Sequence, residues 1–160
     1  CLISITLCPN LFIFMQGLLN FRSTIATQNA FYAAISDAPV SAVDVRDIAE
    51  VATAALTETG HEGKIYDLTG PQTLTHAEMA EQLSTVLGRR ITFVDISPEA
   101  MRDTLLSVGF PIWQADGLIE DYAHYRRHEA AAVTSGVKDA IGKEPRSFET
   151  FAHDYMTLFS

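Results

Sequence analysis

The sequence predicts an α/β fold built around parallel strands, and two observations support this prediction. Short apolar or alternating segments recur between segments of helical periodicity along the 160 residues. The first of them, Leu2–Leu7, is apolar almost throughout, which is typical of a strand buried in a parallel sheet. After Gly70 the helical segments dominate. We therefore expect two parts: residues 1–70, and residues 71–160 as a small, mostly helical α/β subdomain.

The first forty residues predict a strand, a helix and a second strand. Pro9-Asn10 ends the first strand, and a helix is expected from Leu11 to about Thr27 because apolar residues recur along one side of it. The segment 30–34 predicts a short strand, and the turn-forming residues of 36–39 close this part of the chain.

The stretch Val40–Leu56 predicts a short strand followed by a helix, and the rest of the chain is organised around it. Asp44 is a suitable N-cap, and Asp47 places a negative charge in the first turn, where it suits the helix dipole. From Ile48 onward apolar residues recur at helical spacing, which indicates one buried face.

Caps and breakers mark the remaining elements. Thr75 and Glu78 form a capping box, and Ser97-Pro98 is a typical helix start, with a cap followed by proline at the first helical position. Gly109 to Pro111 interrupts the helical pattern. We expect strands at 64–69 and 91–96, and helices at 75–87, 97–108, 112–128, 134–142 and from Ser147 onward, where Thr134 or Ser135 caps the shorter one.

Four segments resemble motifs of the NmrA-like, atypical short-chain dehydrogenase/reductase family, and the resemblance extends over nearly the whole chain. They are V-D-V-x-D-[IV]-A at 43–49, L-R-P-[GN]-x-F at 7–12, Y-x-L-T-G-P at 66–71 and P-R-S-F-E-x-F at 145–151. In the second motif Cys8 stands where the family has arginine. The resemblance implies the C-terminal part of a Rossmann-like NAD(P)-binding fold, followed by a mostly helical substrate-side subdomain.

The chain contains no glycine-rich phosphate-binding loop, which the family carries at the start of its domain. We therefore expect NAD(P)H to be the cofactor of a longer parent protein, and this chain alone, as a fragment, not to bind it tightly. In doubly wound sheets ligands bind beyond the carboxyl ends of the strands. The resemblance accordingly implies cofactor contacts from Pro9, Asn10, Leu11 and Phe12. The alternative is a plain strand-to-helix turn with Asn10 as its cap.

By the same resemblance a substrate pocket is expected between the two parts. Its candidate residues are Met15, Gln16, Met101, Phe110, Trp113 and Tyr122. The alternative is that these apolar side chains form a small helical core, since phenylalanine and methionine rows are more often core than ligand site.

The function implied for the parent protein is NAD(P)H-dependent reduction of a small substrate such as a quinone or an azo compound. The alternative is a non-catalytic protein that senses the NAD(P) state. The Tyr-x-x-x-Lys pair of short-chain dehydrogenases is absent, because Tyr122 is followed at that spacing by Arg126. The sequence therefore names no catalytic residue. It also predicts no metal site: Glu120, His124 and His128 share a helical spacing, but a site needs ligands from a second element.

The composition of the chain limits the kinds of binding partner that can be expected. The formal net charge of -9 argues against binding to nucleic acid or to an anionic membrane surface, both of which require a basic face. No segment is long and apolar enough to predict a membrane helix, and the two cysteines lack metal-ligand spacing, so a cytoplasmic location is expected. An apolar strand such as Leu2–Leu7 is hazardous as an open edge, which predicts a homo-oligomer.

Overall fold

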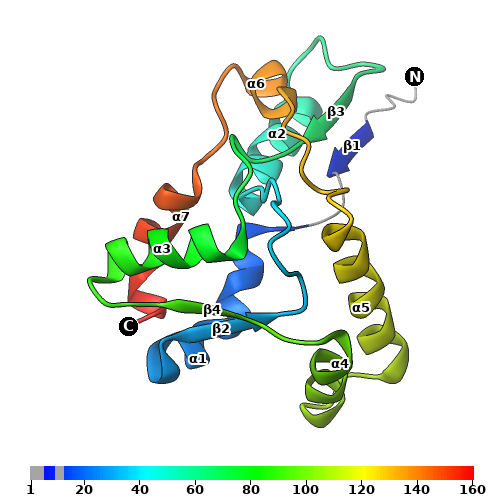
Figure 1. Cartoon of the computed structure of the whole chain (residues 1–160). Coiled ribbons are helices and arrows are strands. Elements are labelled where there is room, and N and C mark those ends of the chain that lie inside the picture. Colours follow the sequence, from blue (N-terminus) through cyan, green and yellow to red (C-terminus); the bar gives the residue numbers. More distant parts are fainter. Residues whose placement is uncertain (1–5, 10–12) are drawn as a thin grey trace.

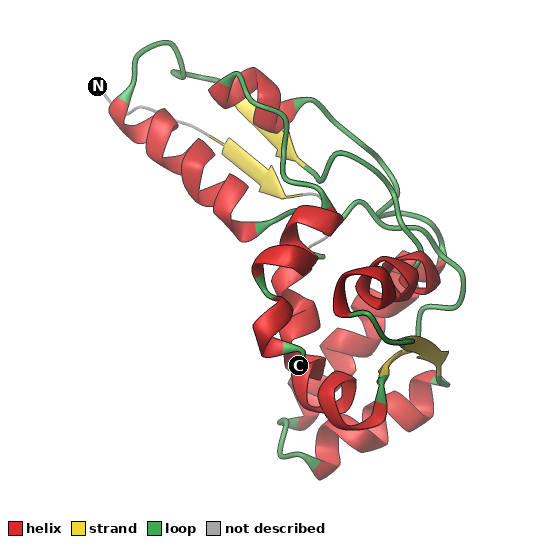
Figure 2. Ribbon diagram, turned by 90° about the vertical axis from the view of Figure 1, so that its left-hand side faces the viewer, coloured by secondary structure: helices red, strands yellow, loops and turns green. Residues whose placement is uncertain are grey.

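The computed structural model describes residues 6–9 and 13–160. Four short strands form two parallel pairs. Strand β1 (Thr6–Pro9) pairs with β3 (Ile65–Leu68), and β2 (Ala30–Ala33) pairs with β4 (Thr92–Asp95). Figures 1 and 2 show that the two pairs lie in different halves of the molecule. The α/β class with parallel strands is confirmed.

Two helices that are far apart in the sequence pack together against the first strand pair. Helix α2 (Val45–Thr57) and helix α6 (Gly136–Ile141) contact each other, and α6 contacts β3. Their shared core is apolar apart from one tyrosine hydroxyl, and it consists of Val51, Tyr66, Leu68, Val137 and Ala140. Helix α6, near the end of the chain, therefore completes the helical layer over β3, which lies about seventy residues earlier in the sequence.

The second strand pair belongs to the larger core. Helix α1 (Arg22–Gln28) contacts β2, while helix α3 (His76–Leu87) contacts both β4 and helix α7 (Phe148–Asp154). A short 3-10 helix, η2 (Met156–Leu158), ends the chain. The largest fully buried side chains of this core are aromatic or branched: Ile25, Phe31, Ile35, Leu83, Phe148, Phe151 and Phe159. Strands β2 and β4 lie on either side of residue 70, so their pairing joins the two parts expected from the sequence. The boundary between these parts at residue 70 stays a prediction.

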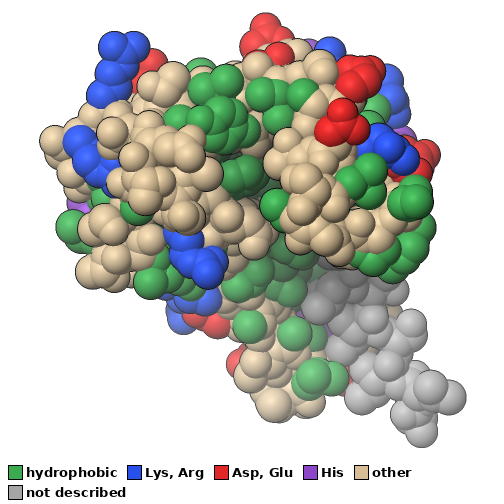
Figure 3. Space-filling model, turned by 90° about the horizontal axis from the view of Figure 1, so that it is seen from below, with side chains coloured by type: hydrophobic (Ala, Val, Ile, Leu, Met, Phe, Trp, Pro, Cys, Tyr) green, Lys and Arg blue, Asp and Glu red, His purple; other side chains and the backbone are tan. Residues whose placement is uncertain are grey.

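Helices α4 (Pro98–Ser107) and α5 (Ile112–Arg126), which follow β4 in the chain, contact each other and form a helical hairpin (Figure 1). Its turn exposes three large apolar side chains: Val108, Ile112 and Trp113. Figure 3, which shows the molecule from below, displays hydrophobic side chains in several separate groups on that face. Among the described residues, no helix is long and apolar enough to cross a membrane.

Two expected elements differ from the structure, and backbone pairing explains both. The expected helix from Leu11 appears instead as a 3-10 helix, η1 (Met15–Phe21), which continues into α1. Val43 donates its backbone N–H to Ile13 and accepts from that of Met15, so the chain is still extended at Phe14, just before η1. The expected strand from Val40 is reduced to two isolated bridges, an antiparallel one between Val40 and Leu74 and a parallel one between Val43 and Phe14.

Two further local predictions differ in detail from the structure. Helix α5 ends at Arg126 rather than His128, and His128 adopts a left-handed backbone conformation with φ of 62°. Ser135 is the N-cap residue of α6, as one of the two expected alternatives, but its side chain makes no cap hydrogen bond. The Thr134 hydroxyl donates to the carbonyl oxygen of Asp67, and the Ser135 hydroxyl donates to Asp139.

Candidate functional site

The carboxyl ends of β1 and β3 meet at one edge of the first strand pair. In the parallel register Pro9 lies opposite Leu68, so the chain leaves both strands at the same level. Ligands of doubly wound folds bind beyond this edge. The edge is therefore the candidate functional site, and Thr69-Gly70-Pro71 is its described wall on the β3 side.

The backbone at Gly70 lies in direct contact with the segment before α2. The Gly70 N–H donates to the carbonyl oxygen of Ser41 at 3.2 Å. A Cβ atom at residue 70 would lie 2.1 Å from the carbonyl oxygen of Ala42, so only glycine permits this approach. The side chain of Thr69 is buried, and its hydroxyl oxygen accepts a hydrogen bond from the N–H of Thr134 at 2.9 Å. The turn after β3 is thus held on both sides.

The extended segment 40–43 connects this edge to three other parts of the chain. Val40 and Leu74 exchange two backbone hydrogen bonds, of 3.0 and 2.9 Å. The Ser41 N–H donates to the carbonyl oxygen of Ala130 at 2.9 Å, and the Ser41 hydroxyl donates to that of Ala132 at 2.6 Å. The segment after α5, the turn after β3 and the start of η1 therefore converge on four consecutive residues.

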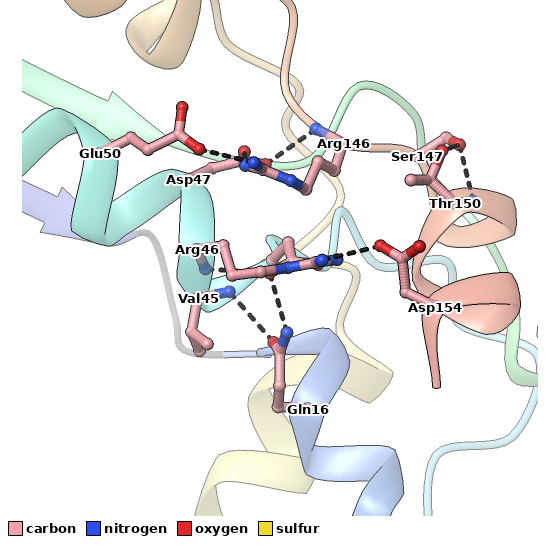
Figure 4. Close-up of polar contacts among 10 residues, drawn as sticks. Gln16, Val45, Arg46, Asp47, Glu50, Arg146, Ser147, Thr150 and Asp154 are labelled. Atoms are coloured by element: carbon pink, nitrogen blue, oxygen red, sulfur yellow. Dashed lines mark hydrogen bonds and ion pairs between the residues drawn. The ribbon is translucent and has the colours of Figure 1, made fainter. Parts of the chain in front are cut away.

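The N-terminus of α2 holds a buried carboxylate with its partners (Figure 4). Asp44 is fully buried, and its Oδ1 accepts hydrogen bonds from the Gln16 amide at 2.8 Å and from the N–H of Arg46 at 2.9 Å. The Arg46 guanidinium also donates to Asp44 and, at 2.7 Å, to Asp154 on α7. Burial by itself would raise the pKa of the Asp44 carboxyl, but hydrogen bonds from Arg46 and Gln16 outweigh it and hold this pKa below its usual value.

A second ion-pair cluster joins α2 to the segment before α7, and it lies beside the first in Figure 4. Arg146 donates to Asp47 through its backbone N–H, at 2.8 Å, and through its guanidinium. The same guanidinium donates to Glu50 at 2.5 Å. Asp47 is only 2% exposed, so its first-turn carboxylate has a buried pairing role in addition to the favourable helix-dipole position.

Sequence reasoning did not identify Arg46 or Arg146 as partners of these carboxylates. Arg146 is 99 residues from Asp47, and no local spacing rule connects them. One signal in the sequence was available: Asp47 and Arg146 each lie in a segment that resembles a family motif, V-D-V-x-D for Asp47 and P-R-S-F for Arg146. Two motif residues of opposite charge, one in each segment, indicate a pair that only the tertiary fold brings together.

The expected cofactor contacts fall at the described end of β1 and just beyond it. Pro9 is the last residue of β1 and lies at the candidate edge. Asn10, Leu11 and Phe12 lie outside the described residues. Their cofactor role stays a prediction.

The structure separates the six expected substrate residues into three groups. Met15 is buried in the larger core, and the half-buried Tyr122 packs against that core, where burial raises the pKa of its hydroxyl. Gln16 is engaged with α2: its Nε2 donates to Asp44, and its Oε1 accepts from the N–H of Val45 at 3.0 Å. The third group lies on the α4–α5 hairpin and consists of Met101, which is buried, Phe110, which is half-buried, and Trp113, which is 76% exposed.

The spacing of Glu120, His124 and His128 does not persist as one helical row, because α5 ends before His128. His124 instead lies against the segment that follows the helix, with its Nδ1 at 2.5 Å from a carboxylate oxygen of Glu129 and 2.8 Å from the guanidinium of Arg127. This arrangement is an exposed cluster of charged groups at the helix end.

Comparisons with known proteins first define a fold class. No family model matches the chain. An NADPH-dependent quinone oxidoreductase from Escherichia coli superposes with a TM-score of 0.80 at 22% identity, covering 90% of this chain and 52% of that one. Triphenylmethane reductase from Citrobacter sp., solved with NADP(H), gives a TM-score of 0.76 at 24% identity, with coverage of 89% and 50%. The fold is therefore part of the NAD(P)-binding fold of the atypical short-chain dehydrogenases.

Sequence similarity then defines the family. The NAD(P)H azoreductase of Xenophilus azovorans is 38% identical over 146 residues, which cover 91% of this chain and 51% of the relative. The chain belongs to the NmrA-like, atypical short-chain dehydrogenase/reductase family of NAD(P)H-dependent oxidoreductases. It spans about half the length of the curated relatives it matches.

Proposed function

We propose that this chain supplies the substrate side of an NAD(P)H-dependent reductase that acts on small electron-accepting molecules such as quinones or azo compounds. The observation that carries the proposal is the shared edge at which β1 and β3 end, closed by the tight contact of Gly70 with Ala42. The likeness to an azoreductase over 91% of the chain supports the same reaction class.

In this proposal NAD(P)H supplies the hydride, and the protein orients it toward the substrate. The described polar groups near the edge fit a positioning role. Asp44, Arg46 and Gln16 are bonded to one another rather than offered to a ligand, and they fix η1 and α2 relative to each other. The α4–α5 hairpin supplies the apolar wall, with Phe110 and Trp113 as its candidate contacts to a planar substrate.

The test is hydride transfer measured as loss of NADPH absorbance with a panel of quinones and azo dyes. It uses a polypeptide extended to include a glycine-rich loop, beside the 160-residue chain. We expect turnover and NADPH binding from the longer polypeptide, with neither from the chain alone, because the phosphate-binding loop is absent from its sequence. NADPH binding by the longer polypeptide without turnover on any acceptor would instead favour a redox-sensing protein. Tight binding by the short chain would contradict our assignment of the cofactor site.

A further inference from the structure

A polar cavity lies at the end of β3 opposite the candidate edge. Its volume is about 570 Å³, within the range of roughly 300–1,000 Å³ typical of small-molecule sites. The loop between α2 and β3 forms one side of the cavity, and the start of α6 forms the other. The cavity is lined by residues at the start of β3, such as Ile65, and not by Thr69 or Gly70, so it is separate from the site described above.

The wall formed by α6 is rigidly attached to the strand. A Cβ atom at Gly136 would lie 2.0 Å from the carbonyl oxygen of Asp67, so the glycine lets α6 begin directly against β3. The Thr134 hydroxyl donates to the same carbonyl oxygen, and the Thr134 N–H donates to Thr69. The cavity is therefore built on fixed backbone rather than between mobile side chains.

The floor of the cavity contains a buried polar pair. His61 and Tyr66 are each 7% exposed, and the His61 Nδ1 lies 2.8 Å from the Tyr66 hydroxyl. The His61 ring lines the cavity, and its other nitrogen, Nε2, has no hydrogen-bond partner among the described residues. Nε2 is not fully buried, so water or a ligand in the cavity can form a hydrogen bond with it.

Charges of both signs line the same cavity. Lys64 is its only cation of fixed charge, and the described part of the chain provides no ion-pair partner for this ammonium. Asp139 on α6 contributes a carboxylate, which accepts a hydrogen bond from Ser135 at 2.6 Å, whereas Asp67 meets the start of α6 through its backbone. A simple anion would pair with Lys64 alone, whereas a zwitterion can pair with charges of both signs.

We propose that this cavity binds a small amino-acid-like zwitterion. Its carboxylate pairs with Lys64, its ammonium faces Asp139, and a polar group of the ligand bonds to Nε2 of His61. The site is independent of the hydride-transfer edge, so neither proposal depends on the other.

The test is isothermal titration calorimetry of the purified chain with four probes. L-Serine carries both charges, 3-hydroxypropionate lacks the ammonium, ethanolamine lacks the carboxylate, and inorganic phosphate is a compact anion. We expect serine to bind about fivefold or more tightly than each of the others, because only serine pairs with both signs. The absence of heat with all four probes, or equal binding of any of them, overturns the proposal.

Matched variants locate the binding. Lys64→Met removes an exposed ammonium from the cavity and should weaken serine about fivefold, while Lys143→Met removes an exposed ammonium elsewhere and should leave the affinity unchanged. Asp139→Asn keeps an oxygen for Ser135 but removes the charge, so it should weaken serine and ethanolamine alike. Equal effects of the two lysine variants would show that the binding is not in this cavity.

Discussion

At the scale of single residues, His76 is the group in which burial and charge conflict most. Its ring is 8% exposed and lies between Phe31 and Phe93, at centroid distances of 6.1 and 5.3 Å. Its Nδ1 has no hydrogen-bond partner. Burial lowers the pKa of His76 from its ordinary 6.5 to about 4, and the charge of Asp95 offsets only part of this effect.

This depressed pKa predicts a loss of stability in weak acid. Above pH 6.5 the ring is neutral in both the folded and the unfolded chain, so it adds no pH dependence. Below pH 6.5 the unfolded chain binds a proton that the folded chain binds only near pH 4, and stability falls in that window. Between pH 7.5 and pH 5 the loss from this one group should be roughly 2 kcal/mol.

Urea unfolding of His76→Phe at the two pH values measures the effect. The variant keeps an aromatic ring in the niche but cannot titrate, so its unfolding free energy should fall less than that of the wild type on acidification. His153→Gln, at an exposed position of α7, is the control and should keep the wild-type dependence. Equal pH dependence in His76→Phe and the wild type would show that another group is responsible.

At the scale of elements, helix starts were the most predictable features because a cap acts within four residues. Thr75 accepts from the N–H of Glu78 in the expected capping box, and Ser97 and Ser147 cap α4 and α7 as expected. Asp44 also caps α2, although its partners Gln16 of η1 and the Arg46 guanidinium were not foreseen. The start of η1 was mispredicted because distant pairing with Val43, not local periodicity, keeps the chain extended there.

In the candidate site, too, features set by nearby residues could be predicted from the sequence, whereas contacts between distant residues could not. The shared edge of β1 and β3 could be expected from the alternation of elements together with the resemblance, because parallel strands end at the same side of a sheet. The ion pairs behind the edge could not be expected, since Arg146 and Asp47 meet only after α6 and α7 have packed. The exposure of Trp113 also depends on tertiary packing, which composition does not report.

The junction of α2 with the segment before α7 predicts a strong effect of Arg146. Replacing Arg146 by methionine leaves the Asp47 carboxylate, which is 2% exposed, without its cation. Removing one partner of a buried pair is costly, and since the arginine side chain is 29% exposed we expect a loss of roughly 2 kcal/mol in unfolding free energy. Urea denaturation measures it.

Lys138→Met is the control for this element. It removes a cation from the Lys138–Glu144 pair, whose side chains are 58% and 68% exposed, and such surface pairs contribute little to stability, so the unfolding free energy should change much less than in Arg146→Met. If Arg146→Met is no more destabilising than this control, the Arg146 cluster is a surface feature and does not hold the chain end to α2.

At the scale of the whole molecule, helices cover the strand pairs unevenly. Helices α2 and α6 pack on the side of β3 that carries Tyr66 and Leu68, while Ile65 on the opposite side is 67% exposed. Within the described residues β1 is hydrogen-bonded to β3 alone, so its other edge offers free backbone groups. Open strand edges tend to pair with another chain.

This edge predicts self-association of the 160-residue chain. Light scattering over a concentration series should give the mass of a dimer or a larger oligomer at high concentration, and the mass should fall on dilution because backbone pairing of a four-residue strand is weak. A polypeptide that supplies a partner strand for β1 should be less prone to associate, since the edge is then occupied. A monomer of the short chain at all concentrations would contradict the prediction and would mean that its exposed edge is protected, for example by strand twist or by charged neighbours.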